Sequence, residues 1–175
     1  PVKFWRIPLD EICPTPVALA LGSNLGDRLG SLRKAVAALA SCVEVKSISP
    51  VYETAPAYIT DQPVFLNAAV TGITQLEPLP LLWALKNLER DIGRTPTFRY
   101  GPRVIDIDIL FYDDMIFESP ELIIPHPRLF ERDFVLKPLS DIAPTWKHAA
   151  LGKTVTELLA ALPANTMTHL GPLMP

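Results

Sequence analysis

Cysteine is scarce in this chain, with only Cys13 and Cys42 among 175 residues. Two isolated cysteines cannot form a disulfide framework and do not match a CxxC metal site, so we expect reduced thiols in a cytoplasmic protein. No stretch approaches the roughly 20 continuous apolar residues of a membrane helix, which argues against membrane insertion. The net charge of -3 gives no general attraction for nucleic acid or for an anionic surface.

Proline is the residue type in excess, with 19 copies, about twice the ordinary usage of ~5%. The prolines are scattered, so they separate elements of a folded chain and do not form a proline-rich ligand. A chain of 175 residues with 49% hydrophobic residues can bury one core. We expect a leader or linker over residues 1–16 and a single domain over residues 17–175.

Apolar runs and amphipathic stretches mix along the chain without a regular βα repeat, which favours an α+β fold. Leu81, Leu85 and Leu88 recur at helical spacing, whereas Ile105, Ile107 and neighbouring residues alternate as in a strand. Strands are expected over residues 17–21, 43–51 with a bend at Pro50, 64–74 and 104–111, hairpin pieces over 115–117 and 122–124, and helices after Asp27, after Pro80 and over 154–162.

Asp106 and Asp108 are the clearest chemical signal, because they leave the same face of a predicted strand. Their side chains originate about 6 to 7 Å apart, from a rise of ~3.3 Å per residue. Mg²⁺ prefers such carboxylate oxygens and completes its shell with water and phosphates. An ordinary half-exposed strand with its carboxylates in solvent would also alternate in this way, so the pair alone does not distinguish a magnesium site from such a strand.

Three arginines, Arg94, Arg99 and Arg103, lie just upstream of the aspartates. Guanidinium groups match phosphate oxygens, although mutual salt bridges on a solvated loop would also explain any one of them. His126 lies between two prolines that fix its direction. Carboxylates, arginines and this histidine together predict a magnesium-dependent site for a nucleotide phosphate.

Several motifs in this order resemble one enzyme family. They are ALGSNLGD at 20–27, YETAP at 52–56, DQPVFLNA at 61–68, GPRVIDIDIL at 101–110 and IPHPR at 124–128. The chain is similar to 6-hydroxymethyl-7,8-dihydropterin pyrophosphokinases over roughly residues 17–162. The resemblance implies a ferredoxin-like α+β fold, with a mainly antiparallel sheet and helices packed on its faces. It also implies transfer of pyrophosphate from ATP to the hydroxymethyl group of the dihydropterin, which leaves AMP, as a step of folate biosynthesis.

The same resemblance implies roles at the nucleotide end of the site. Asp106 and Asp108 would hold two magnesium ions against the ATP phosphates, and they would form the catalytic set with Arg94 and Arg103. Phosphates or ribose would contact Arg94, Arg103, His126 and Arg132, with Glu89 near the nucleotide. Arg99 would contact the nucleotide with this group, from a loop that is a residue shorter than in some members of the family.

At the pterin end, the resemblance implies that Phe65 and Phe134 stack on opposite faces of the ring. Asn67 and the backbone near Thr54 and Ala55 would bind the ring edge, with Gly22 and Asn24 lining the same pocket. The expected partners are ATP, the dihydropterin and a neighbouring folate-pathway domain or enzyme. Nucleic acid and membranes are not expected partners. The loops at 54–63 and 94–103 are expected to close over ATP and exclude water.

Two other readings stay open from the sequence. A ligand-sensing or RNA-binding module could share the fold, although Asp106 and Asp108 would repel RNA phosphates unless a metal intervened. A different magnesium-dependent nucleotidyl or phosphoryl transferase could share the spacing. The products distinguish these alternatives. Pyrophosphoryl transfer yields AMP, another transferase would yield ADP or free pyrophosphate, and a binding module would yield no product.

Overall fold

The computed structural model describes residues 13–98, 100–163 and 166–174. Within these residues the main sheet has six strands in the order β5-β1-β4-β3-β8, with β2 also paired to β4, and every pairing is antiparallel. A separate hairpin joins β6 to β7. The strands are β1 (Thr15–Ser23), β2 (Glu44–Ile48), β3 (Pro50–Thr54), β4 (Phe65–Thr74), β5 (Asp106–Tyr112), β6 (Phe117–Glu118), β7 (Ile123–Ile124) and β8 (Thr168–Pro172).

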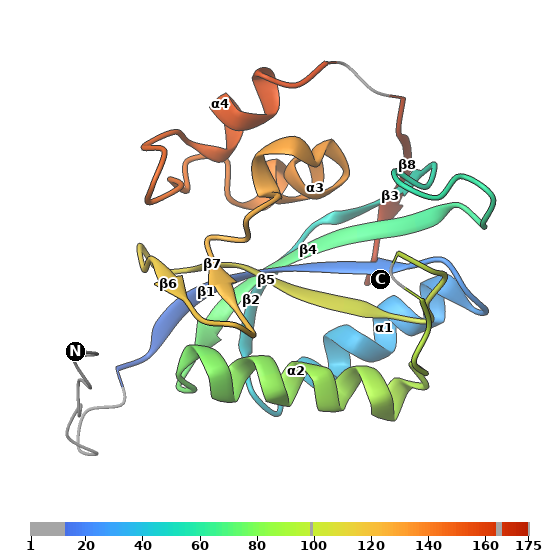
Figure 1. Ribbon diagram of the computed structural model, residues 1–175, viewed down its shortest axis with the longest axis horizontal. Coiled ribbons are helices and arrows are strands. Elements are labelled where there is room, and N and C mark those ends of the chain that lie inside the picture. Colours follow the sequence, from blue (N-terminus) through green and yellow to red (C-terminus); the bar gives the residue numbers. More distant parts are fainter. Residues whose placement is uncertain (1–12, 99, 164–165, 175) are drawn as a thin grey trace.

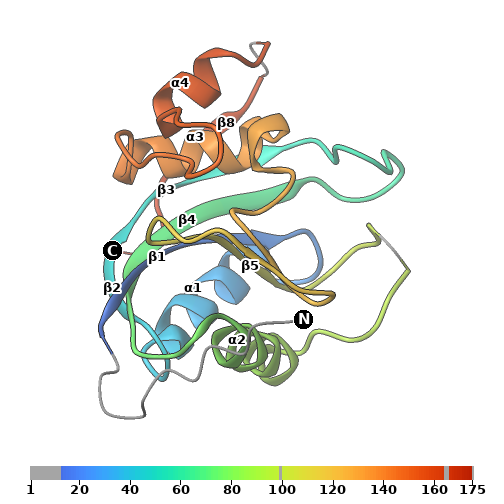
Figure 2. The ribbon, with the colours of Figure 1, turned by 60° about the vertical axis from the view of Figure 1, so that its left-hand side comes forward.

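Helices cover both faces of this sheet (Figures 1 and 2). On one face lie α1 (Arg28–Leu39) and α2 (Pro78–Ile92), and on the other lie α3 (Asp133–Ile142) and α4 (Val155–Ala160). The chain runs from β1 through α1 to β2 and β3, then through β4 and α2 to β5, which returns beside β1. The expected α+β, ferredoxin-like architecture is therefore confirmed.

Local signals explain where the helices begin and end. Asp27 caps α1, because its Oδ1 accepts a hydrogen bond of 2.9 Å from Gly30 N. Helix α2 begins at Pro78, earlier than expected, since proline is tolerated in the first turn. It ends at Gly93, whose φ of 114° is a left-handed conformation that glycine adopts without strain. The expected capping box of Thr154 and Glu157 begins α4.

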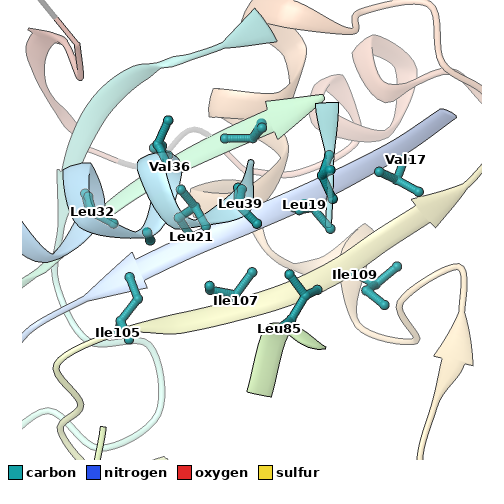
Figure 3. Packing of buried hydrophobic residues seen from close by; sticks show 14 of the residues in the cluster. Val17, Leu19, Leu21, Leu32, Val36, Leu39, Leu85, Ile105, Ile107 and Ile109 are labelled. Atoms are coloured by element: carbon teal, nitrogen blue, oxygen red, sulfur yellow. The ribbon is translucent and has the colours of Figure 1, made fainter. Parts of the chain in front are cut away.

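The apolar residues predicted to face inward form the larger core, between the sheet and helices α1 and α2. Figure 3 shows β1 and β5 contributing side chains that meet those of α1 and α2. Burial of this kind stabilises by about 25 cal/mol per Å² of apolar surface. The labelled contributors are Val17, Leu19, Leu21, Leu32, Val36, Leu39, Leu85, Ile105, Ile107 and Ile109.

Helix α3 was not expected from the sequence, because Pro138 lies inside it and interrupts the helical pattern. Val135, Leu136 and Leu139 are nevertheless buried against the second face of the sheet, and this packing outweighs the backbone hydrogen bond lost at the proline. The helix matters for the site, since it follows directly after Arg132 and carries Phe134.

Other element boundaries differ from the expectation in small ways. Strand β1 begins at Thr15, so Thr15 and Pro16 pair with β4 in the sheet, and residues 1–12 of the expected leader lie outside the described residues. Strand β8 was not expected, because a short segment with Gly171 and Pro172 has no strand-like pattern. No helix among the described residues is long and apolar enough to cross a membrane.

Candidate active site

A cavity of about 320 Å³ opens at the edge of the sheet where β1 ends and β4 and β5 begin, beside the loops that follow β3 and α2. Both loops extend from the same end of the molecule (Figure 2). The strand register sets the floor of the cavity: Gly22 pairs with Asn67 on one side and with Asp106 on the other, and Ala20 pairs with Asp108. Because glycine and alanine lie beside the polar residues, the floor has room for a ligand.

Asp106 lies among three cations. Its Oδ1 accepts a hydrogen bond from Arg94 Nη1 and lies 3.9 Å from Lys86 Nζ, while its Oδ2 lies 3.2 Å from Arg103 Nη1. Burial alone would raise the pKa of Asp106, but the charges of Arg103, Lys86 and Arg94 outweigh burial and lower it. Asp106 is therefore ionised at neutral pH.

Asp108 is less well compensated. Lys86 Nζ lies 4.0 Å from its Oδ1, which is the longest of the ion-pair distances in the cavity floor. Burial in the cavity wall and the negative charge of Asp106 raise the pKa of Asp108 to about 6. Two carboxylates two residues apart thus hold their protons with different strength.

Helix α2 contacts the outer edge of β5 at Ile107, the residue between Asp106 and Asp108. Glu89 Oε1 accepts a hydrogen bond of 2.7 Å from Ile107 N, and Lys86 Nζ donates one of 3.2 Å to Ile107 O. Glu89 is 2% exposed, and its charge is offset by Lys86 Nζ at 2.7 Å and Arg94 Nη1 at 2.6 Å. Glu89 therefore lies beneath the cavity and positions the residues above it.

Asn24 joins both loops to the end of β1. Its Nδ2 donates hydrogen bonds of 3.1 Å to Gln62 Oε1 and to Pro63 O, and its Oδ1 accepts one of 2.8 Å from Arg103 N. Arg103 lines the cavity, and its Nε is buried without a hydrogen-bond partner among the described residues. An unpaired buried donor of this kind matches an acceptor on a bound anion.

His126 and Arg132 reach the cavity from the segment between β7 and α3. Arg128 N donates a hydrogen bond of 3.1 Å to His126 Nδ1. Burial, and then the charge of Arg132, lower the pKa of His126 to about 4. The imidazole is neutral at pH 7, and because Nδ1 accepts, its proton is on Nε2, which can donate to a ligand.

Aromatic, amide and hydroxyl side chains also line the cavity beside the charged residues. Phe65 and Phe134 both line it, on β4 and α3, and Asn67 Nδ2 donates a hydrogen bond of 2.7 Å to Thr54 Oγ1. Ala55 follows on the loop after β3. Aromatic planes beside amide and hydroxyl groups suit a flat heterocycle with polar edges.

A contact that we call the loop clasp joins Tyr58, Tyr100 and Arg128 across the loops. The Arg128 guanidinium carbon lies 4.3 Å from the centroid of the Tyr58 ring, and Nη1 donates a hydrogen bond of 2.7 Å to Tyr100 Oη. The two tyrosine rings are 4.6 Å apart, and Tyr100 has a φ of 63°, which is unfavourable for a bulky residue. The clasp holds a strained residue in place.

Most predicted site residues meet in this one cavity. Asn24 and Glu89 do not line it but fix residues that do, and Arg99 lies outside the described residues. The predicted residues that line it are Gly22, Thr54, Ala55, Phe65, Asn67, Arg94, Arg103, Asp106, Asp108, His126, Arg132 and Phe134.

Sequence reasoning missed Lys86, Tyr58 and Gln62, which also line the cavity. Lys86 could have been found, because it precedes Glu89 by three residues and shares its face of the predicted helix. Tyr58 lies in a loop without periodicity, so nothing in the pattern marked it, and Gln62 belongs to the DQPVFLNA motif but was assigned no role.

The residues present fit a magnesium ion better than a softer metal. No group of three or more histidine, cysteine, aspartate or glutamate side chains is placed to hold a metal in the described part of the chain. Two carboxylates, with the remaining positions left to water and phosphate oxygens, are the usual ligands that a protein offers Mg²⁺. Asp106 and Asp108 supply that pair.

Comparison with known sequences agrees with the geometry of the cavity. The family model described as 7,8-dihydro-6-hydroxymethylpterin-pyrophosphokinase matches residues 18–144. The 2-amino-4-hydroxy-6-hydroxymethyldihydropteridine pyrophosphokinase of Bacillus subtilis is 48% identical over 126 residues, which cover 71% of this chain and 75% of that protein. The enzyme of the same name from Aquifex aeolicus is 40% identical and covers 86% and 92%.

Longer relatives are also similar. The mitochondrial folate synthesis bifunctional protein of Arabidopsis thaliana is 54% identical over 127 residues, which are 72% of this chain but 23% of that protein. The chain spans about a quarter of the length of such bifunctional relatives. The crystal structure of wild-type Plasmodium falciparum HPPK-DHPS shares the fold, with a TM-score of 0.67 at 18% identity over 85% of this chain and 44% of that one.

Proposed function

Because this chain belongs to the 7,8-dihydro-6-hydroxymethylpterin-pyrophosphokinase family, we propose that it transfers pyrophosphate from ATP to 6-hydroxymethyl-7,8-dihydropterin. The products are AMP and the pterin diphosphate, and the reaction is a step of folate biosynthesis. One observation carries the proposal: a single cavity is lined by a carboxylate pair, by arginines and by two phenylalanine rings, and the guanidinium carbons of Arg103 and Arg132 lie 5.6 Å and 5.9 Å from the ring centroids of Phe65 and Phe134.

The arginines support binding of a polyphosphate. Arg94 and Arg103 are held beside Asp106, and Arg132 is held by Tyr58, whose Oη accepts a hydrogen bond of 3.1 Å from Arg132 Nε. Transfer of a phosphoryl group requires alignment and charge neutralisation more than covalent help from the protein. These fixed cations supply both for the phosphates of ATP.

The carboxylates support binding of divalent cations. Asp106 and Asp108 would hold Mg²⁺, two ions in our proposal, as oxygen ligands on the same face of β5. Bound Mg²⁺ would neutralise phosphate charge and orient the phosphates for in-line displacement. Lys86, Arg94 and Glu89 keep the carboxylate pair fixed from below.

The phenylalanine rings support binding of the pterin. Phe65 and Phe134 would stack on its faces, while Asn67, Thr54 and the backbone at Ala55 would bind its polar edge. The bond that forms joins the pterin hydroxymethyl oxygen to the β-phosphorus of ATP, and the bond between that phosphorus and the oxygen of the α-phosphate breaks. AMP leaves with that oxygen, and the hydroxyl proton is released to water. His126, neutral at pH 7, would donate from Nε2 to a phosphate or ribose oxygen.

Product analysis tests the reaction. The protein is incubated with ATP, Mg²⁺ and 6-hydroxymethyl-7,8-dihydropterin, and the mixture is resolved by chromatography. AMP and the pterin diphosphate should appear in equal amounts, and omission of either substrate should abolish both. ADP or free pyrophosphate would indicate a different transferase, and the absence of product from folded protein would reduce the site to a binding module.

The surroundings of the domain are part of the proposal. Relatives named as bifunctional folate synthesis proteins support a neighbouring folate-pathway domain or enzyme as a partner. We also propose a cytoplasmic location, although some of these relatives are named as mitochondrial. Fractionation of the source cells with an antibody against this domain would test the location.

A further inference from the structure

The position of Lys86 assigns it a task that the nucleotide site does not require. Its Nζ is fixed by two short contacts, 2.7 Å to Glu89 Oε1 and 3.2 Å to Ile107 O. From that position the ammonium also lies 3.9 Å from Asp106 Oδ1 and 4.0 Å from Asp108 Oδ1. It therefore lies beside both carboxylates that would hold the metal.

Lys86 matters more for Asp108 than for Asp106. Asp106 has Arg94 and Arg103 as additional ion-pair partners. Within the described part of the chain, Lys86 is the only lysine or arginine with a cationic nitrogen within 4.0 Å of Asp108. Attraction at this distance between partly buried charges is several times stronger than in bulk water.

We propose that Lys86 is the internal counter-cation of the Asp106–Asp108 pair. Before a divalent cation binds, the ammonium offsets the repulsion between the two carboxylates. When the metal ion binds, the Lys86 ammonium repels it, because the ammonium and the metal ion then both lie beside the same carboxylate pair. The short contacts to Glu89 and Ile107 keep Lys86 in place, so Lys86 lowers metal affinity while it stabilises the metal-free site.

This inference rests on the proposed metal site. It predicts a change in Mg²⁺ affinity opposite to the change expected if Lys86 only supported the fold or only bound the nucleotide. A lysine that only supports the fold, or that only binds ATP, would leave the affinity for Mg²⁺ alone unchanged or reduce it. A counter-cation should instead weaken Mg²⁺ binding. Its removal should therefore tighten Mg²⁺ binding while it lowers the melting temperature of the metal-free protein.

The experiment compares wild type, Lys86→Met, Lys86→Arg and the control Lys46→Met, in which a lysine of an exposed ion pair is lost. Calorimetric titration with MgCl₂, without nucleotide, should show roughly fivefold tighter binding for Lys86→Met. Its melting temperature in EDTA should fall by about 2–4 °C. Lys86→Arg and the control should resemble wild type. If Lys86→Met does not fold, Lys86→Gln takes its place with the same expected result.

A double-mutant cycle in EDTA separates the electrostatic effect from loss of the contacts to Glu89 and Ile107. The melting-temperature loss caused by Lys86→Met should shrink in an Asp108→Asn background, because the unneutralised charge is then absent. Unchanged or weaker Mg²⁺ binding by Lys86→Met, or an equal loss in both backgrounds, would overturn the counter-cation role. Failure of wild type to bind Mg²⁺ alone would overturn the counter-cation role, and failure to bind it also with a non-hydrolysable ATP analogue would overturn the metal site itself.

Discussion

Over residues 106–109, the two faces of β5 are built from consecutive residues and have opposite properties. Ile107 and Ile109 point to the helices α1 and α2 and are at most 2% exposed. Asp106 and Asp108 point to the cavity, with side chains 18% and 33% exposed. One face contributes stability through apolar burial, whereas the other keeps charges close together, which costs stability unless partners offset them.

The contrast shows how a rigid strand can carry a site that is unfavourable alone. The packed face fixes the backbone, and the backbone fixes the spacing of the aspartates. Helix α2 serves both faces, because Leu85 packs in the core while Lys86 and Glu89 contact the edge of β5 at Ile107. Substitutions on the two faces should therefore separate activity from stability.

Asp108→Ala should have the largest effect, a loss of activity without a loss of stability. Loss of a carboxylate ligand should lower kcat by at least about 100-fold, as for loss of a group that stabilises transition-state charge. The melting temperature in EDTA should not fall, because no core packing is lost. Formation of AMP measures activity, and circular dichroism measures stability. A severe loss of stability in metal-free buffer would contradict the separation of the two faces.

Ile109→Ala should show the reverse behaviour, one residue further along the strand. Its side chain is 2% exposed, so truncation should reduce the free energy of unfolding by about 2–5 kcal/mol. Well below the melting temperature, kcat per folded molecule should change by less than about threefold. Urea denaturation and an activity assay at low temperature measure the two quantities. A change in kcat as large as that of Asp108→Ala would show that the faces are coupled.

Elements with a strong pattern could be predicted from the sequence. The alternation in β5, the apolar period of α2 and the caps at Asp27 and Thr154 all depend on neighbours in the chain. Helix α3 could not be predicted in this way, because its stability comes from packing of residues such as Leu136 against the sheet despite Pro138. Strand β8 depends likewise on pairing with β3, which is distant in sequence.

The site was predictable where chemistry and motif coincide and not where it depends on a contact between distant segments. Asp106, Asp108 and Arg103 stand close together in the sequence, and the structure brings them together. Lys86 reaches the aspartates around the edge of the sheet, and the clasp residue Tyr58 meets Arg128 across 70 positions. The proximity of Tyr58 and Arg128 leaves no local signal in one sequence, whereas Lys86 is marked only by its helical spacing from Glu89.

Arg128→Met should have a moderate effect through the loop clasp. The side chain stays long, but the cation over Tyr58 and the hydrogen bond to Tyr100 are lost. Because both contacts are lost, the KM for ATP should rise a few-fold, with a smaller change in kcat.

Hydrogen exchange shows whether the clasp acts through the loops. A non-hydrolysable ATP analogue with Mg²⁺ should protect residues 54–63 and 94–103 in wild type and protect them less in Arg128→Met. The core strand β4 should exchange equally in both proteins. Absence of loop protection in wild type would refute closure, and full protection in the variant would refute the role of the clasp.

The smallest effect should be a pH-dependent difference between the two aspartates in metal-free protein. The pKa of Asp108 is raised to about 6, above the ~3.9 of an unfolded chain, so its favourable contribution to stability is present below pH ~3.9 and is lost as pH rises through about 6. Asp108→Asn should therefore match wild type near pH 4 and melt a few °C higher above pH ~6. The pKa of Asp106 is lowered, so Asp106→Asn should melt below wild type at pH 7, with the difference closing in acid. Scans of melting temperature against pH in EDTA measure both differences. If the two variants showed the same pH dependence, the aspartates would share one electrostatic environment, and the predicted difference between them would be wrong.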